Sequence, residues 1–178
     1  MKKIIYFLFF LSILSFSSLK RNNDYTHSFS GTIFTNKTGQ FNIIGPKIYD
    51  DLGKDIGVGY KSTSKVELTH YIYPSGNESL KSQFNGYRNS LLSEKSNIKC
   101  LTTKEITTSK MNGMFSKFSL IENFYGSDKK VNSYLYMYKC KGWFIMIRIT
   151  CDTTNIKLKE KDIEGYLNKM QFPKKEYR

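Results

Sequence analysis

Residue types that carry most catalytic and metal chemistry are scarce in this sequence. It has only two histidines and three cysteines among 178 residues, and their spacing does not match a zinc site. No Gly-x-Ser-x-Gly string, which presents the nucleophilic serine of many hydrolases, is present. The string 57–62 lacks the glycine spacing of a phosphate loop, and the aspartates near Gly53 lack the alternation of a calcium loop. The sequence therefore predicts no cofactor and no metal, and it favours a protein that is not an enzyme.

Long apolar runs are also rare, and the longest lies at the N-terminus. Two lysines precede the apolar stretch 4–14, and small serines follow it. This order is typical of a secretory signal peptide, so we expect residues 1–18 to be cleaved after Ser17 or Ser18. An uncleaved anchor is the alternative, but the stretch is shorter than the roughly 20 residues that cross a bilayer. The sequence predicts an exported protein, periplasmic or extracellular, with no transmembrane segment after cleavage.

Acidic residues are in deficit. The chain has 28 lysines and arginines against 15 aspartates and glutamates, a net charge of +13, and loss of two lysines with the signal peptide lowers it to +11. A basic exported protein is suited to an envelope protein or an anionic envelope component, whereas export argues against nucleic acid as a partner. The alternative is an ordinary solvated surface, because the lysines are spread along the chain.

The three cysteines leave an odd thiol in an oxidising compartment. Cys140 and Cys151 lie near opposite ends of the final expected strand. About eight residues of strand at ~3.3 Å each separate them, which is too far for a disulfide. We therefore expect a disulfide of Cys100 with Cys140 or Cys151, while a buried free thiol is equally compatible for each. A thiol nucleophile would need a nearby base. The two histidines give little support for one, because His27 lies in the expected lead-in and His70 in an expected strand.

Hydrophobic periodicity predicts one α+β domain over residues 31–178, preceded by a flexible lead-in over 19–30. Short strands are expected over 32–35, 41–44, 47–49, 56–61 and 66–73, and four more form a meander over 99–151. Apolar residues at helical spacing, from Leu80 to Leu91, predict a central helix, and a second helix is expected over 160–170. Asn112-Gly113 is a strong hairpin signal within the meander. We expect a single antiparallel sheet of about six to seven strands, packed by the central and C-terminal helices.

Side chains alternate between the two faces of a strand. In the last hairpin of the meander, the residues on each of these faces are mostly apolar. We expect the face with Trp143 to be the core beneath both helices. The opposite face is apolar but edged with charge, which makes it the candidate partner-binding face. Its residues are Leu135, Met137, Lys139, Phe144, Met146 and Arg148. Cover by a loop or by the first strands is the alternative.

Two strings give a resemblance to known proteins. Residues 48–60 followed by 69–74 are similar to a "YD..G.D..VGY" and "T.Y.YP" pattern of exported bacterial proteins without an ascribed activity. The order of elements over 31–173 resembles the Mog1/PsbP-like proteins. The resemblance implies an α+β fold, export, and action by binding other proteins, the last by analogy of fold alone.

The leading functional hypothesis is a non-catalytic binding or accessory module of the cell envelope. An envelope hydrolase is one alternative, because acid and base groups scattered through a fold escape a search for motifs. A carrier of a small apolar ligand, held between sheet and helix, is the other.

Overall fold

We describe residues 23–94, 97–108 and 111–177 in a computed structural model of the chain. The expected signal peptide, residues 1–18, lies outside this range. Within it, no helix has the length and apolar character needed to cross a bilayer.

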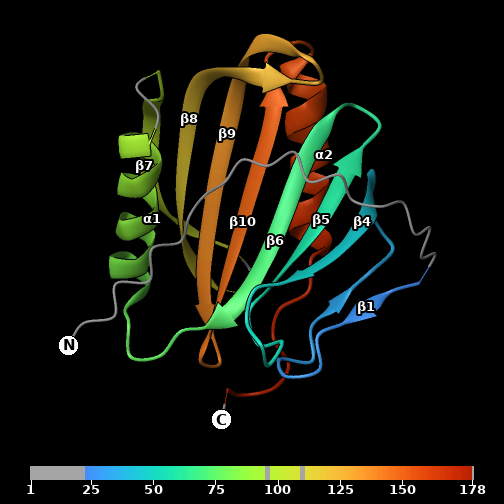
Figure 1. The fold of residues 1–178 in the computed structure, drawn as a ribbon, viewed down its shortest axis with the longest axis vertical. Coiled ribbons are helices and arrows are strands. Elements are labelled where there is room, and N and C mark those ends of the chain that lie inside the picture. The colour runs from blue at the N-terminus through green and yellow to red at the C-terminus, as the bar shows by residue number, and fades with distance from the viewer. Residues whose placement is uncertain (1–22, 95–96, 109–110, 178) are drawn as a thin grey trace.

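The described chain contains short and long strands and two helices (Figure 1). The strands are β1 (Tyr25–Thr26), β2 (Ile33–Phe34), β3 (Lys37–Thr38), β4 (Phe41–Ile48), β5 (Ile56–Ser62), β6 (Val66–Pro74), β7 (Lys99–Thr107), β8 (Asn112–Phe124), β9 (Ser127–Cys140) and β10 (Trp143–Asp152). The helices are α1 (Leu80–Glu94), between β6 and β7, and α2 (Ile156–Lys169), after β10.

The main sheet is antiparallel and has eight strands in the order β3-β4-β5-β6-β10-β9-β8-β7, while β1 and β2 pair separately. The expected α+β fold with one large antiparallel sheet is confirmed, with eight strands in place of six to seven. The sheet centre joins distant parts of the chain, since β6 pairs with β10 and Ile147 lies opposite His70. The first strands and the meander therefore form one continuous sheet.

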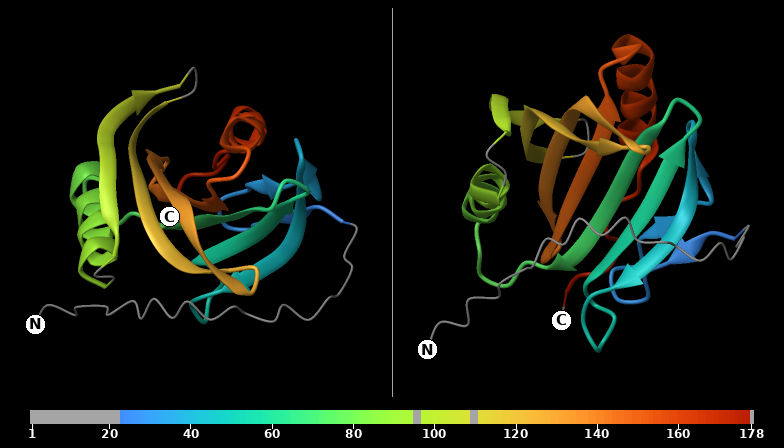
Figure 2. Two further views of the ribbon diagram at one scale, coloured as in Figure 1. Left: turned by 90° about the horizontal axis from the view of Figure 1, so that it is seen from above. Right: turned by 45° about the horizontal axis from the view of Figure 1, so that its top comes forward.

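The two helices cover opposite faces of this sheet, which curves around α2 (Figure 2). On the inner face, Ile163 and Tyr166 of α2 join the large core that contains Trp143. On the outer face, Phe84 and Leu91 of α1 pack on β8, β9 and β10. The expectation that both helices lie over the Trp143 face is wrong. Because β9 and β10 are apolar on both faces, each face needs its own cover.

The segment expected to be a flexible lead-in is ordered from residue 25 onward. Tyr25 and Thr26 form β1, and the side chains of His27 and Ser30 are buried. The His27 Nε2 atom lies 2.9 Å from the carbonyl oxygen of Gly53, and its Nδ1 atom lies 2.7 Å from the hydroxyl of Ser30. This part of the expected lead-in, residues 25–30, therefore belongs to the folded domain.

The hairpin signal Asn112-Gly113 does not form the turn itself. Both residues lie in β8, where Asn112 is paired with Thr107 of β7, and the Thr108 amide donates to the carbonyl of Met111, which precedes them. Gly113 is needed for another reason: a Cβ atom there would lie 2.5 Å from the Tyr138 ring. Close approach of the ring of β9, rather than a positive φ, accounts for this glycine.

Candidate functional site

The face expected to bind a partner is mostly interior. The side chains of Met137, Phe144 and Met146 are buried beneath α1, so the expectation of an exposed apolar face there is wrong. Lys139 is exposed at its edge, and its ammonium donates to the Glu78 carbonyl at 2.6 Å. Arg148 is half-buried. A helix, rather than the loop or first strands considered as alternatives, provides the cover.

The expected disulfide is also wrong, because all three thiols are free. Cys100 packs with the outer-face cluster, whereas Cys140 and Cys151 belong to the inner-face core. Cys100 lies on β7, two strands from β9 and three from β10, and each strand spacing is about 4.8 Å. These separations exceed the reach of a disulfide.

Burial shifts the pKa of two of the thiols and of the His70 imidazole away from values that suit catalysis. Burial raises the pKa of Cys140 and raises that of Cys151 to about 11, the opposite of what a nucleophilic thiol needs. Burial likewise lowers the pKa of His70 to about 3, and its Nδ1 atom lies 3.0 Å from the Tyr166 hydroxyl. Within the described residues, no group of His, Cys, Asp and Glu is arranged to hold a metal ion.

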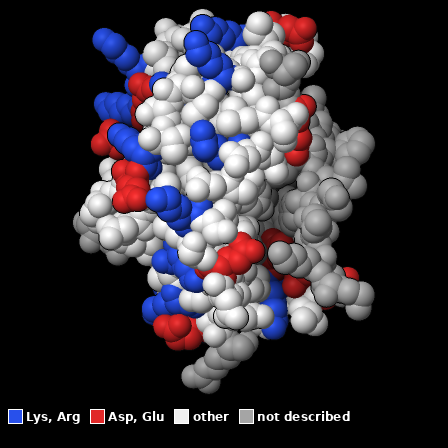
Figure 3. All heavy atoms as spheres, turned by 90° about the vertical axis from the view of Figure 1, so that its left-hand side faces the viewer, with Lys and Arg blue, Asp and Glu red and all other residues white. Residues whose placement is uncertain are grey.

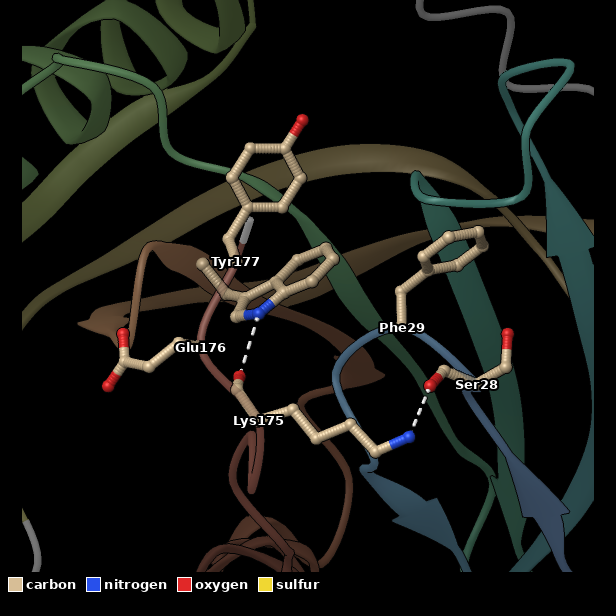
Figure 4. Close-up of a pocket in the computed structure, with 6 residues that line it drawn as sticks. Ser28, Phe29, Lys175, Glu176 and Tyr177 are labelled. Carbon is tan, nitrogen blue, oxygen red and sulfur yellow. Dashed lines mark hydrogen bonds between the residues drawn. The ribbon is translucent and has the colours of Figure 1, made fainter.

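A pocket of about 470 Å³ lies where the two ends of the described chain meet, and we call it the basal pocket (Figure 4). The loop after β1, the start of β10 and the tail after α2 form it. The lining residues are Ser28, Phe29, Trp143, Lys175, Glu176 and Tyr177. Segments more than a hundred residues apart in the sequence thus build one site.

Trp143 is the single tryptophan of the chain and a buried wall of this pocket. Its indole nitrogen donates to the Lys175 carbonyl at 3.1 Å. Its ring meets those of His27 and Tyr177 edge to face, with centroids 5.4 and 5.0 Å apart. Edge-to-face packing is a favourable geometry for aromatic pairs, so the indole is fixed from several directions.

Two exposed aromatic rings and a lysine stand at the pocket mouth. Phe29 is 41% exposed and Tyr177 is 37% exposed. The ammonium of Lys54 lies 5.6 Å from the centroid of the Phe29 ring and 5.2 Å from that of Tyr177. Lys54 comes from the turn between β4 and β5, which the carbonyl contact of Gly53 with His27 ties to the pocket. The mouth therefore combines apolar area with a positive charge.

Backbone hydrogen bonds hold the tail in place. The amides of Lys174 and Lys175 both donate to the Ser30 carbonyl, at 2.8 and 3.0 Å, and the Tyr177 amide donates to the Lys141 carbonyl at 2.9 Å. The ammonium of Lys175 also donates to the Ser28 carbonyl at 2.9 Å. The pocket is therefore preformed, which limits the conformational entropy lost on binding.

Sequence reasoning missed this pocket. It placed Trp143 in the core, as found, but it assigned Phe29 to a flexible lead-in and gave Tyr177 no role. A lone tryptophan directly after the Lys141-Gly142 turn was the available signal. Nothing in the local sequence indicates that residue 29 meets residue 177.

Surface charge on the side that carries α1 and β7 is mixed. Lys and Arg side chains lie there in a loose band along one edge, with Asp and Glu among them (Figure 3). Mixed signs of this kind are typical of a solvated surface.

Comparisons with known proteins bear on the fold alone. No family model matches the chain, and no curated protein matches it. The solution structure of cyanobacterial PsbP (CyanoP) from Synechocystis sp. PCC 6803 is similar, with a TM-score of 0.55 and 8% sequence identity. The match covers 84% of this chain and 91% of that chain. The resemblance to PsbP-like proteins is thus confirmed at the level of architecture: this chain has a PsbP-like α+β fold.

Proposed function

We propose that this protein is an exported, non-catalytic binding module of the cell envelope, and that its basal pocket holds an acidic segment of an envelope protein. The N-terminal signal sequence and the net charge of +11 after its removal support export and an acidic partner. The PsbP-like fold is compatible with such a role but carries no function by itself.

The arrangement of Phe29, Lys54 and Tyr177 beside the buried Trp143 carries the proposal. Interface hot spots are enriched in aromatic residues that sit in fixed, well-packed positions. Lys54, between the two exposed rings, adds an attraction for carboxylates. Lys175 lines the pocket, and the ammonium of Lys141 donates to the Lys174 carbonyl in the adjoining tail. Glu176 is the one acidic residue of the lining. The pocket therefore suits a partner that presents an apolar side chain flanked by acidic ones.

A carrier of a small apolar ligand is the second candidate. The volume of about 470 Å³ falls within the range of about 300–1,000 Å³ that small-molecule sites occupy. The two candidates differ in what is bound, so one experiment separates them.

Export is tested by producing the full chain in a bacterial host and fractionating the cells. The expected product is a soluble envelope protein that begins at residue 18 or 19, by N-terminal sequencing. An intact chain that stays in the cytoplasm would contradict the proposal.

The binding role is tested with a photo-crosslinking amino acid at Phe29, in cells that export the protein. Leu158 of α2, which is 55% exposed, is the matched control position. We expect a protein adduct with an acidic segment from position 29 only, and its loss in the Lys54→Gln variant. An apolar small molecule found by native mass spectrometry supports the carrier instead. Equal crosslinking from both positions overturns both candidates.

A further inference from the structure

Four tyrosines converge on the outer face of the sheet, near the β4–β5 turn. Tyr71 and Tyr73 project from β6, Tyr87 comes from α1, and Tyr49 follows β4 directly. Tyr49 and Tyr71 have ring centroids 6.0 Å apart, and Tyr73 and Tyr87 have centroids 6.4 Å apart. Three elements thus contribute rings to one cluster.

Gly57 of β5 allows two of these rings to lie close to the sheet, because it has no side chain. A Cβ atom at Gly57 would lie 2.9 Å from the Tyr71 ring and 3.1 Å from the Tyr49 ring, so these rings lie directly on the backbone of β5. The hydroxyl of Tyr73 accepts a hydrogen bond from the Gln83 amide nitrogen at 3.4 Å. Tyr49 remains 36% exposed, which leaves one side of the cluster open to solvent.

Asp55, the residue before β5, lies beside Tyr49, whose backbone amide donates to the Asp55 carbonyl at 2.8 Å. Burial in the first place, and the charge of Asp55 in addition, raise the pKa of Tyr49, Tyr73 and Tyr87. Burial, together with the charge of Asp50, raises the pKa of Asp55 itself to about 6. Among the described residues, no hydrogen bond or ion pair to the Asp55 carboxylate is found.

We propose that Tyr49, Tyr71, Tyr73 and Tyr87, together with Asp55, form a site for an alkylammonium cation, and we call it the tyrosine site. Aromatic faces attract cations through the ring quadrupole, and aromatic cages recognise quaternary ammonium groups in this way. A nearby carboxylate without a partner adds charge complementarity. The proposal does not depend on the function proposed for the basal pocket.

The structure already places one cation on this cluster. The ammonium of Lys47 lies 5.2 Å from the centroid of the Tyr49 ring, so the accessible face of that ring accepts a positive charge. The Asp55 carboxylate also gives this site a negative charge, whereas the chain as a whole has an excess of lysines. A ligand cation would compete with Lys47 for the Tyr49 ring.

The test is an NMR titration of the full chain, carrying labelled tyrosine rings, with choline chloride. The matched neutral probe is the alcohol in which carbon replaces the choline nitrogen. We expect saturable shifts confined to the rings of the tyrosine site with choline, and much weaker effects with the neutral alcohol. Vesicles of phosphatidylcholine, compared with free choline, distinguish a lipid headgroup from a soluble ligand, since either source presents the same ammonium.

Variants assign the effect to named groups. We expect Asp55→Asn to weaken choline binding about tenfold, with Asp51→Asn, on the same turn, as the control that leaves it unchanged. Tyr49→Leu should remove binding and Tyr49→Phe should retain it, because the ring and not the hydroxyl attracts the cation. Lys47→Gln should strengthen it.

Three results overturn the proposal: equal binding of choline and the neutral alcohol, no effect of Asp55→Asn, or shifts on other rings. Thermal unfolding of each variant establishes that it is folded. If Asp55→Asn does not fold, the Tyr49→Leu and Tyr49→Phe pair, at a position that is 36% exposed, decides alone.

Discussion

The position of Asp55 in the fold disfavours the ionised form of its carboxyl group. Asp55 lies beside Tyr49, whose amide donates to its carbonyl. Burial, together with the charge of Asp50, raises the pKa of the Asp55 carboxyl from 3.8 to about 6. The folded state therefore binds the Asp55 proton more tightly than the unfolded chain does. Groups with such unfavourable ionisation are concentrated at functional sites.

The pH dependence of stability tests this at a single residue. Because the folded pKa is raised, the contribution of Asp55 to the free energy of unfolding is present below about pH 4 and is lost as the pH rises through about 6. Asp55→Asn removes that loss, so we expect equal stability at about pH 4. At neutral pH, where solvent screening of a half-exposed group limits the gain, the variant should be more stable by up to about 1 kcal/mol.

Urea unfolding at both pH values measures the difference, with Asp51→Asn as the exposed control. A variant that is less stable than the native protein at neutral pH would show that the Asp55 carboxylate is stabilised in the fold, contrary to its raised pKa.

At the scale of elements, the position of α1 determines whether the outer face of β9 and β10 is buried or exposed. Phe84 and Leu91 of this helix lie against Met137, Phe144 and Met146. The same strands would have presented a methionine-rich surface if α1 lay on the other face. The position of one helix thus converts a candidate binding surface into core.

Met137→Asp tests this assignment. A carboxylate beneath α1 would be buried among apolar side chains, so we expect a loss of at least about 3 kcal/mol in the free energy of unfolding, or failure to fold. Met137→Leu conserves the volume and should cost less than about 1.5 kcal/mol. Chemical denaturation of both variants gives the comparison, and a Met137→Asp protein of native stability would mean that this face is exposed.

At the scale of the whole molecule, the two ends of the described chain are joined by hydrogen bonds. The loop after β1 and the tail after α2 share hydrogen bonds through Ser30 and Lys175, and both contact Trp143. The tail therefore shields the single tryptophan and forms a wall of the basal pocket.

Removal of residues 174–178 tests the role of this closure. Trp143 should become accessible to water, so we expect a red shift of its emission and stronger quenching by acrylamide. Loss of several hydrogen bonds, each worth about 1 kcal/mol, should also lower the midpoint of thermal unfolding. Tyr177→Phe, which keeps the ring, should leave the emission unchanged. Native emission from the shortened chain would show that the tail does not cover the indole.

The sequence by itself determined the local structure and the class of fold. The spacing from Leu80 to Leu91 predicts α1, and runs of strand-forming residues between turn signals predict β6, β9 and β10, because both patterns depend on neighbouring residues. The PsbP-like resemblance followed from the order of these elements. Residues 1–18 predict export by the same kind of local pattern.

Only the tertiary structure decided which surfaces meet. The face that α1 covers, the separation of Cys100 from Cys151, and the reason for Gly113 all depend on contacts between residues distant in the sequence. The basal pocket joins Phe29 to Tyr177, and the tyrosine site joins Tyr49 to Tyr87. Such contacts are selected by the joint burial of both sheet faces, a property of the assembled fold that no local window of sequence contains.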